Sequence, residues 1–292
     1  LYQQAVKPIV FANLLFAADS SDPKIGAFFQ KQQEQATGLN VKLLFFELEV
    51  QAAPDAYIEA ALADPALANY EHFLRVARQF RPHRLSEKEE ILLEETANTG
   101  SRAWQRLFDE VTANHVYRLR RPGSEVDEEV SEQEVLALLR DPDRATRQAA
   151  ADTFTAGLKE LNRVLTFTFN NLLQDKAVED RLRKYEFPEQ SRHMGNELDP
   201  ETVDLVIRLC REHYALVSRF YHVKREILGL PELTHIDRYA PLHETKEKVS
   251  WDRARDIVLE AFGSFSPELA EKGKEFFDKN WIDAPVRPGK AS

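Results

Sequence analysis

The chain has 292 residues, of which 43% are hydrophobic and 10% aromatic, and its 39 basic and 49 acidic residues give a formal net charge of −10. This length and apolar content suffice for one large or two ordinary domains with a sizeable core, which argues against intrinsic disorder. The acidic balance argues against proteins that bind nucleic acid or anionic membranes, because both classes need a basic face.

The single cysteine, Cys210, excludes an intramolecular disulfide and a cysteine metal cluster, which is typical of a reducing cytoplasm. No apolar run approaches the ~20 residues that span a bilayer. Residues 1–20 lack the basic segment and apolar core of a secretion signal. We therefore expect a cytoplasmic protein. Because the chain begins at Leu1 and ends at Ser292 without an evident terminus, we also expect both ends to be cut from a longer protein.

Residues 1–85 are expected to be helical. An apolar helix covers 9–18, and a glutamine-rich helix that begins at Ile25 is expected to stop at Gly38. The run 41–50 fits either a buried strand or a helix, and we favour the helix because its large apolar residues share one face. Two short helices follow, at 55–62 and 69–80, with Asp-Pro and Arg-Pro dipeptides as breaks.

Serine capping boxes begin two of the next helices. Ser86 and Ser131 are each followed three residues later by glutamate, which predicts helices from 86 to about 96 and from 131 to 140. Between them lies a helix after Gly100, and then the period changes. The alternation over 115–120, followed by Pro-Gly, predicts a small β-hairpin near 115–130.

The longest periodic stretch is 141–185. Asp141 is expected to cap this helix and Pro142 to occupy its first position. Large apolar residues recur with steps of three or four, which places them on one face: Phe154, Leu158, Leu161, Leu165, Phe169 and Leu172. We expect this stripe to be buried and the helix to break near Lys176 or Asp180. The charged residues around Asp180 are expected to be solvated.

Helices are also predicted at 199–228, 250–262 and 266–277, with an irregular segment at 233–242 and another after 280. Gly229 is expected to end the first of these helices. The predicted fold class is therefore mainly α, a multi-helix scaffold with one small hairpin.

The residues alone do not predict a complete active site. No pair of the eight histidines has the H-E-x-x-H spacing of a zinc site, and neither a phosphate-binding glycine loop nor a G-x-S-x-G elbow is present. We expect the histidines to be structural or on the surface. The aromatic group Tyr214, Phe220 and Tyr221 and the small Cys210 are expected in the core.

Five stretches carry a family resemblance, in order along the chain. They are Arg81-Pro82-His83-Arg84-Leu85-Ser86-Glu87-Lys88-Glu89-Glu90; Asp143-Arg144-Ala145-Thr146-Arg147-Gln148-Ala149-Ala150; Tyr221-His222-Val223-Lys224 with Leu228-Gly229-Leu230; Asp237-Arg238-Tyr239-Ala240-Pro241-Leu242; and Trp281-Ile282-Asp283 with Gly289-Lys290. Together they resemble the oligoendopeptidase F branch of the M3 family of zinc metallopeptidases.

The resemblance implies a helical peptidase scaffold around a deep cleft, in which zinc and a glutamate activate water to hydrolyse short peptides. The zinc-binding H-E-x-x-H motif of the family is absent from this sequence, so no catalytic or metal residue is transferred to it. The zinc cofactor and its ligands are expected outside this segment, which alone should be inactive. Residues 1–85 would form the N-terminal helical region, and 86–292 the first part of the catalytic domain.

The candidate substrate-cleft residues are Tyr239, which is expected to pack near the end of the chain, and Gly289, Lys290, Ala291 and Ser292. The expected partners are short peptides, and neither nucleic acid nor membrane. Two alternatives stay open: a non-catalytic helical interaction module, or an M3-like protein without zinc. A hydrolase that uses carboxylates of this chain is a further, weaker alternative. If the catalytic half is missing, an exposed apolar patch of more than a few hundred Å² should lie near residues 235–292.

Overall fold

The computed structural model describes residues 2–243, 248–285, 287, 289 and 290. Within these residues the chain is mainly α-helical, as predicted, with one two-stranded antiparallel sheet. In chain order the elements are α1 (Tyr2–Ala5), α2 (Lys7–Ala18), α3 (Pro23–Ala52), α4 (Asp55–Leu62), η1 (Pro65–Tyr70), α5 (Glu71–Gln79), η2 (Arg81–His83), α6 (Glu87–Ala97), α7 (Ser101–Ala113), β1 (Tyr117–Arg120), β2 (Asp127–Val130), α8 (Glu132–Leu138), α9 (Arg144–Arg183), α10 (Gln190–Gly195), α11 (Pro200–Glu212), α12 (Tyr214–Ile227), η3 (His235–Asp237), α13 (Trp251–Phe265) and α14 (Pro267–Asp278).

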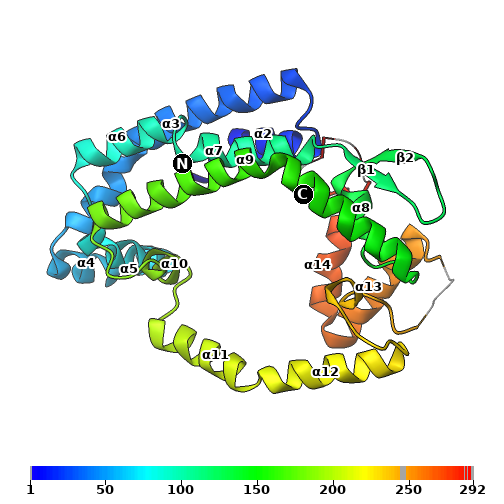
Figure 1. The fold of residues 1–292 in the computed structure, drawn as a ribbon. Helices are drawn as coiled ribbons and strands as arrows, with labels where there is room; N and C mark the ends of the chain where they lie inside the picture. The colour runs from blue at the N-terminus through cyan, green and yellow to red at the C-terminus, as the bar shows by residue number, and fades with distance from the viewer. Residues whose placement is uncertain (1, 244–247, 286, 288, 291–292) are drawn as a thin grey trace.

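Helix α9 is the spine of the molecule (Figure 1). It has 40 residues, so at ~1.5 Å per residue it spans about 60 Å. Helices α2, α3, α6 and α7 lie along one side of α9, and the hairpin and α8 lie against its beginning. After α9 the chain swings out through α10, α11 and α12 and returns through α13 and α14, so the elements follow one another round a ring.

One buried core lies where the hairpin meets the beginning of α9. Strands β1 and β2 pair in the register Tyr117 with Val130 and Arg120 with Asp127. The buried residues of this core come from both strands, α8 and α9: Tyr117, Leu119, Val130, Val135 and Ala150. Phe154 packs against them and stacks on Tyr117, with ring centroids 5.8 Å apart. The predicted hairpin is therefore confirmed, and it anchors the spine.

The capping boxes predicted at Ser86 and Ser131 are both present. In each, the serine hydroxyl accepts a hydrogen bond from the backbone N–H three residues on, and the glutamate there accepts one from the serine N–H. These contacts satisfy N–H groups that a helix start leaves free, which is why so local a pattern is sufficient to predict α6 and α8.

The predicted stop at Gly38 is wrong, because α3 continues through it to Ala52. The helical interpretation of 41–50 is confirmed. Contacts from other helices support α3 at this point: the Asn98 amide donates to the Thr37 hydroxyl at 2.8 Å, and Arg102 donates to the same hydroxyl at 3.4 Å. Glycine weakens a helix only by about 1 kcal/mol, so such tertiary contacts outweigh it.

Two details predicted for α9 are wrong. The cap is Asp143, whose carboxylate accepts from the Thr146 N–H at 2.8 Å, and Asp141 instead accepts from the Asp143 N–H. The helix does not break near Lys176 or Asp180; these two residues instead form an ion pair four residues apart along its surface. It ends at Arg183, and the next residue, Lys184, adopts the left-handed conformation with φ of 58°.

The predicted stripe of α9 is half-buried at five of its six positions, and Phe169 is 61% exposed. The fully buried residues belong to a neighbouring face and are mostly small: Arg147, Ala150, Thr153, Gly157 and Thr168. Small side chains let the hairpin approach the helix closely, so the face of closest contact differs from the face with the largest apolar residues.

The helix predicted from 199 to 228 is two helices, α11 and α12, divided at His213. The His213 ring Nδ1 lies 2.8 Å from the Leu209 carbonyl oxygen, a group that the helical backbone also uses. Cys210, Tyr214 and Phe220 are exposed, which corrects the prediction that they belong to the core. Spacing alone could not reveal that little packs on these two helices.

Large exposed apolar residues also occur on the returning segment, including Tyr239, Trp251, Phe265, Phe276 and Trp281. The apolar patch expected near residues 235–292 stays a prediction, because single exposed apolar residues also occur along the rest of the described chain. Among the described residues, none of the helices combines the length and apolar character needed to cross a bilayer.

Candidate functional site

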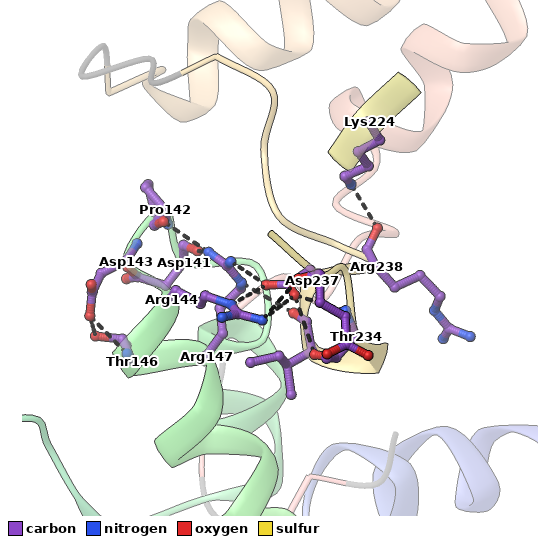
Figure 2. Close-up of polar contacts among 12 residues, drawn as sticks. Asp141, Pro142, Asp143, Arg144, Thr146, Arg147, Lys224, Thr234, Asp237 and Arg238 are labelled. Atoms are coloured by element: carbon purple, nitrogen blue, oxygen red, sulfur yellow. Dashed lines mark hydrogen bonds and ion pairs between the residues drawn. The ribbon is translucent and has the colours of Figure 1, made fainter. Parts of the chain in front are cut away.

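Three of the sequence stretches that carry the family resemblance meet at the beginning of α9 (Figure 2). Arg144 and Arg147 come from the first turns of α9, Asp237 from η3, and Lys224 from α12. The arginines lie 93 and 90 positions from Asp237 along the chain. We call this group, together with Thr234, the Asp237 junction.

Arg147 is the centre of the junction. It is 3% exposed, and its Nη2 donates to the Asp237 carboxylate at 2.9 Å. Its Nε donates to the Ile236 carbonyl at 3.1 Å, and its Nη1 donates to the carbonyls of Asp141 and Pro142 at 2.8 Å each. One buried guanidinium therefore ties the loop before α9 to the segment around η3.

Asp237 has a fully buried side chain whose two oxygens are well supplied with donors. Arg144 donates to both oxygens, at 2.9 and 2.8 Å, and the Thr234 N–H and hydroxyl donate at 3.0 and 3.2 Å. Burial by itself would raise the pKa of Asp237, but the hydrogen bonds from Arg144, Thr234 and Arg147 lower it well below its usual value. The carboxylate is thus held ionised.

Lys224 attaches α12 to the same segment. It is buried, and its Nζ donates to the Arg238 carbonyl at 2.8 Å. Burial lowers the pKa of Lys224, the charge of Arg147 lowers it further, and Asp237 opposes both effects. The junction therefore joins α9, η3 and α12 through buried charges.

The junction positions backbone segments, and its geometry does not suit acid–base or nucleophilic chemistry. Asp237 is held as an ionised acceptor and saturated with donors, so it is a poor proton acceptor or donor near neutral pH. Arginine does not give up its proton at such pH values. What the junction does is fix the loops on either side of it.

Tyr239, a predicted cleft residue, lies two residues beyond Asp237 and is 46% exposed. The guanidinium carbon of Arg140 lies 5.0 Å from its ring centroid and that of Arg238 lies 4.5 Å from it. Tyr239 therefore lies on the surface beside the buried junction.

Gly289 and Lys290, two more predicted cleft residues, have other contacts: Gly289 lies against the loop between α2 and α3, and Lys290 lies against the segment just before it in the chain. The Ser20 N–H and hydroxyl donate to the Gly289 carbonyl at 2.7 and 2.8 Å. Lys290 donates to the carbonyls of Asp283 and Pro285 at 2.6 and 3.1 Å. Within the part of the chain that the structure describes, neither residue forms a hydrogen bond or ion pair with Tyr239. Ala291 and Ser292, the last two predicted cleft residues, lie outside the described residues.

A second charged junction closes the far end of α9. Arg183 donates to both carboxylate oxygens of Glu90 at 2.8 and 2.9 Å, and the His83 Nδ1 contacts the Arg183 carbonyl at 2.9 Å. Burial opposes ionisation of Glu90, yet the bonds from Arg183 and the Leu85 N–H lower its pKa overall. The prediction that the charged residues here are simply solvated is wrong for Arg183.

The described residues do not fit a zinc site, since no three histidine, cysteine, aspartate or glutamate side chains among them are placed to hold a metal ion. The histidines with hydrogen bonds contact single groups, such as His72 with Glu197. Two histidine ring nitrogens, His115 Nε2 and His193 Nδ1, are buried and have no hydrogen-bond partner among the described residues.

The pattern of each helix by itself does not predict the Asp237 junction, because the members of the junction lie far apart along the chain. The family-like motifs did contain a signal, since Arg144 and Arg147, which are three apart, share a helix face. A buried arginine needs an acceptor, and two arginines on one buried face would have pointed to a distant carboxylate.

Comparison with known proteins supports the same resemblance. The family model described as Oligopeptidase F matches residues 49–116. Over 297 residues the chain is 24% identical to group B oligopeptidase PepB of Streptococcus agalactiae, covering 100% of this chain and 49% of that protein. It is 25% identical over 300 residues to an oligoendopeptidase F homolog of Lactococcus lactis subsp. lactis, covering 99% of this chain and 48% of that protein.

The fold agrees as well. The crystal structure of oligoendopeptidase F from Enterococcus faecium superposes with a TM-score of 0.77 at 18% identity, covering 99% of this chain and 61% of that one. The chain spans about half the length of the curated relatives it matches. The resemblance predicted from the motifs is thus confirmed: in sequence and in fold, this chain is related to the oligoendopeptidase F proteins.

Proposed function

We propose that this chain is part of a zinc-dependent peptidase of short peptides, in which it supplies the helical scaffold and one wall of the substrate cleft. The observation that carries the proposal is the match to curated oligopeptidases along essentially the whole chain, over about half of their length. Peptidase relatives imply peptide substrates, and the cytoplasm is the compartment that the cysteine content favours.

The zinc dependence in this proposal is inferred from the resemblance to the M3 family. Because the sequence contains no H-E-x-x-H motif and no group among the described residues could hold a metal ion, we place the zinc ligands in another part of the peptidase. The chemical step is therefore not assigned to any residue of this chain. In this scheme residues 1–85 are the N-terminal helical region and 86–292 the beginning of the catalytic domain.

The proposed contribution of this chain is positional. Tyr239, Gly289 and Lys290 are the candidate residues of the cleft wall. The Asp237 junction fixes the segment that carries Tyr239, and the Ser20 contacts fix Gly289. Buried charge pairs suit such a role, because breaking one partner is costly and the segments therefore keep one arrangement.

The test compares residues 1–292 with the complete product of the gene on an internally quenched short peptide. The complete protein should bind zinc and cleave the peptide, lose activity with a chelator and regain it with zinc. Residues 1–292 alone should neither bind zinc stoichiometrically nor cleave the peptide. Chelator-sensitive cleavage by residues 1–292, or a complete gene product that neither binds zinc nor cleaves, would contradict the proposal.

A non-catalytic interaction module is the second candidate, and the exposed faces of α11 and α12 favour it. Among their described residues only Lys224 is buried, while Val206, Tyr214, Val217 and Phe220 are exposed. Contiguous exposed apolar surface marks interaction sites. A gene product that lacks H-E-x-x-H and cleaves no peptide would support this candidate over the peptidase.

A further inference from the structure

An exposed tyrosine ring is flanked by two guanidinium groups beside the Asp237 junction. Arg140 and Arg238 both lie within cation–π distance of the Tyr239 ring, at 5.0 and 4.5 Å. Arg238 also donates through Nη2 to the Tyr239 hydroxyl at 2.5 Å. All three side chains are exposed. Figure 2 shows the Arg238 guanidinium directed away from Asp237. The group is thus a positively charged, partly aromatic surface.

Neither guanidinium is neutralised by a carboxylate within the part of the chain that the structure describes. The nearest acidic residues along the chain are engaged with other groups: Asp141 accepts from the Asp143 N–H, and Asp143 from Thr146. Asp237 is occupied by Arg144 and Arg147. Arg140 and Arg238 therefore keep N–H donors free in a chain whose net charge is −10.

The backbone segments that carry Arg140 and Arg238 are held in place by hydrogen bonds from buried cations. Arg147 Nη1 holds the carbonyl of Asp141, the residue after Arg140, and Arg147 Nε holds the carbonyl of Ile236, two residues before Arg238. Lys224 holds the carbonyl of Arg238 itself. Both segments are thus tied to buried cations before any ligand arrives, and such preorganisation lowers the cost of binding.

We propose that Arg140, Arg238 and Tyr239 bind the C-terminal carboxylate of a short peptide. The choice of a peptide rests on the proposed peptidase function, and the choice of a carboxylate rests on the two unneutralised guanidinium groups. A guanidinium presents parallel N–H donors that match a carboxylate, and the exposed ring can pack against the last side chain of the peptide. The Asp237 junction then acts as the support of a carboxylate-binding surface.

The experiment measures binding to residues 1–292, without any cleavage. The probe is a short peptide without aspartate or glutamate, labelled at its N-terminus and carrying a free C-terminal carboxylate, and its affinity is followed by fluorescence anisotropy. The same peptide with a C-terminal amide should bind about tenfold more weakly, because it lacks the charge that the arginines pair with. Arg140→Gln and Arg238→Gln should each weaken binding of the peptide with the free carboxylate and leave binding of the amidated peptide unchanged.

Two further variants make the result specific. Tyr239→Phe keeps the ring, and with it the cation–π contacts, but removes the hydroxyl that accepts a hydrogen bond from Arg238, so it should weaken binding less than Arg238→Gln. Arg163→Gln removes an exposed arginine from α9, away from this site, and should leave binding unchanged. Equal binding of acid and amide peptides, no binding of either, or equal losses in Arg163→Gln would overturn the inference. Cleavage by the complete gene product is a separate measurement, so the peptidase proposal can stand or fall independently.

Discussion

The two parts of α9 differ in how they are held, although one continuous helix contains both. The first part, up to Gly157, buries four residues against the hairpin, α8 and the Asp237 junction: Arg147, Ala150, Thr153 and Gly157. In the longer second part only Thr168 is buried among its residues, and Phe167, Phe169 and Leu173 are exposed. A single helix can therefore be a core element at one end and a bridging element at the other.

The difference teaches where the stability of this fold resides. Small residues and a buried arginine bring other segments close to the first part, so its contacts are dense and hard to change. The second part is held by half-buried side chains and, at its end, by the Arg183–Glu90 pair, whose side chains are 19% and 12% exposed. Substitutions in the first part should therefore cost more free energy of unfolding than those in the second.

The largest effect is expected for Arg147→Ala. This change leaves the buried Asp237 carboxylate with Arg144 alone as its cationic partner and removes the bonds to three backbone carbonyls. Removing one partner of a buried pair costs about 3–5 kcal/mol, and urea denaturation followed by circular dichroism measures it. The control Arg163→Ala, exposed on the same helix, should change the free energy of unfolding by less than about 0.5 kcal/mol. Similar losses in both variants would mean that the junction contributes little.

A close second is Gly157→Ala. A Cβ at this position would overlap the Tyr117 ring and lie 2.9 Å from the His115 Nε2, so the hairpin would have to move. Overpacking of this kind costs about 1–3 kcal/mol. The matched change Gly38→Ala in α3 meets nothing within 4 Å and should stabilise the protein by about 0.4–1 kcal/mol. Thermal unfolding of the two variants should therefore shift in opposite directions, and a stabilised Gly157→Ala would contradict the close packing.

These contrasts also show what could be predicted from the sequence. The helix starts at Ser86 and Ser131 were predictable because the capping contacts lie within four residues. The hairpin was predictable because alternation and Pro-Gly are local too. The course of α3 through Gly38 was not, because contacts from Asn98 and Arg102 decide it. Local patterns therefore predict where a helix begins. Contacts between distant segments determine whether it continues through a residue, such as Gly38, that would otherwise end it.

The candidate site, too, could be predicted only in part from the sequence. The sequence marked Arg144, Arg147 and Asp237 as parts of family-like motifs, but not as partners of one another. Their pairing across more than 80 residues follows from the return of the chain through α12 and η3, which no periodicity records. Tyr239 was singled out from the resemblance, and Arg238 lies in the same family-like stretch. Arg140 was not singled out, because it follows α8 and lies far from Tyr239 along the chain.

An intermediate effect is expected for Glu90→Gln, which weakens the junction at the far end of α9. The loss should be about 1 kcal/mol at neutral pH, because the glutamine side chain loses the charge but keeps a carbonyl oxygen that can accept a hydrogen bond from Arg183. The folded-state pKa of Glu90 lies below its ordinary value of 4.5, so this stability is present above pH 4.5 and is lost as the pH falls through the folded-state pKa. Denaturation at neutral and acidic pH should show the gap between wild type and variant narrowing in acid. A gap that stays constant would contradict this role.

The smallest effect is expected for Phe169→Ala, and it tests the comparison most directly. Phe169 belongs to the same apolar stripe as Phe154, but it is 61% exposed, whereas Phe154 packs on the hairpin core and stacks on Tyr117. Truncating an exposed ring should change the free energy of unfolding by less than about 0.5 kcal/mol, while Phe154→Ala should cost clearly more because it opens a cavity beside Tyr117. Urea denaturation of both variants measures the two losses of unfolding free energy. Equal losses would mean that the second part of α9 is buried in the protein in solution, as the spacing of its apolar residues alone predicts.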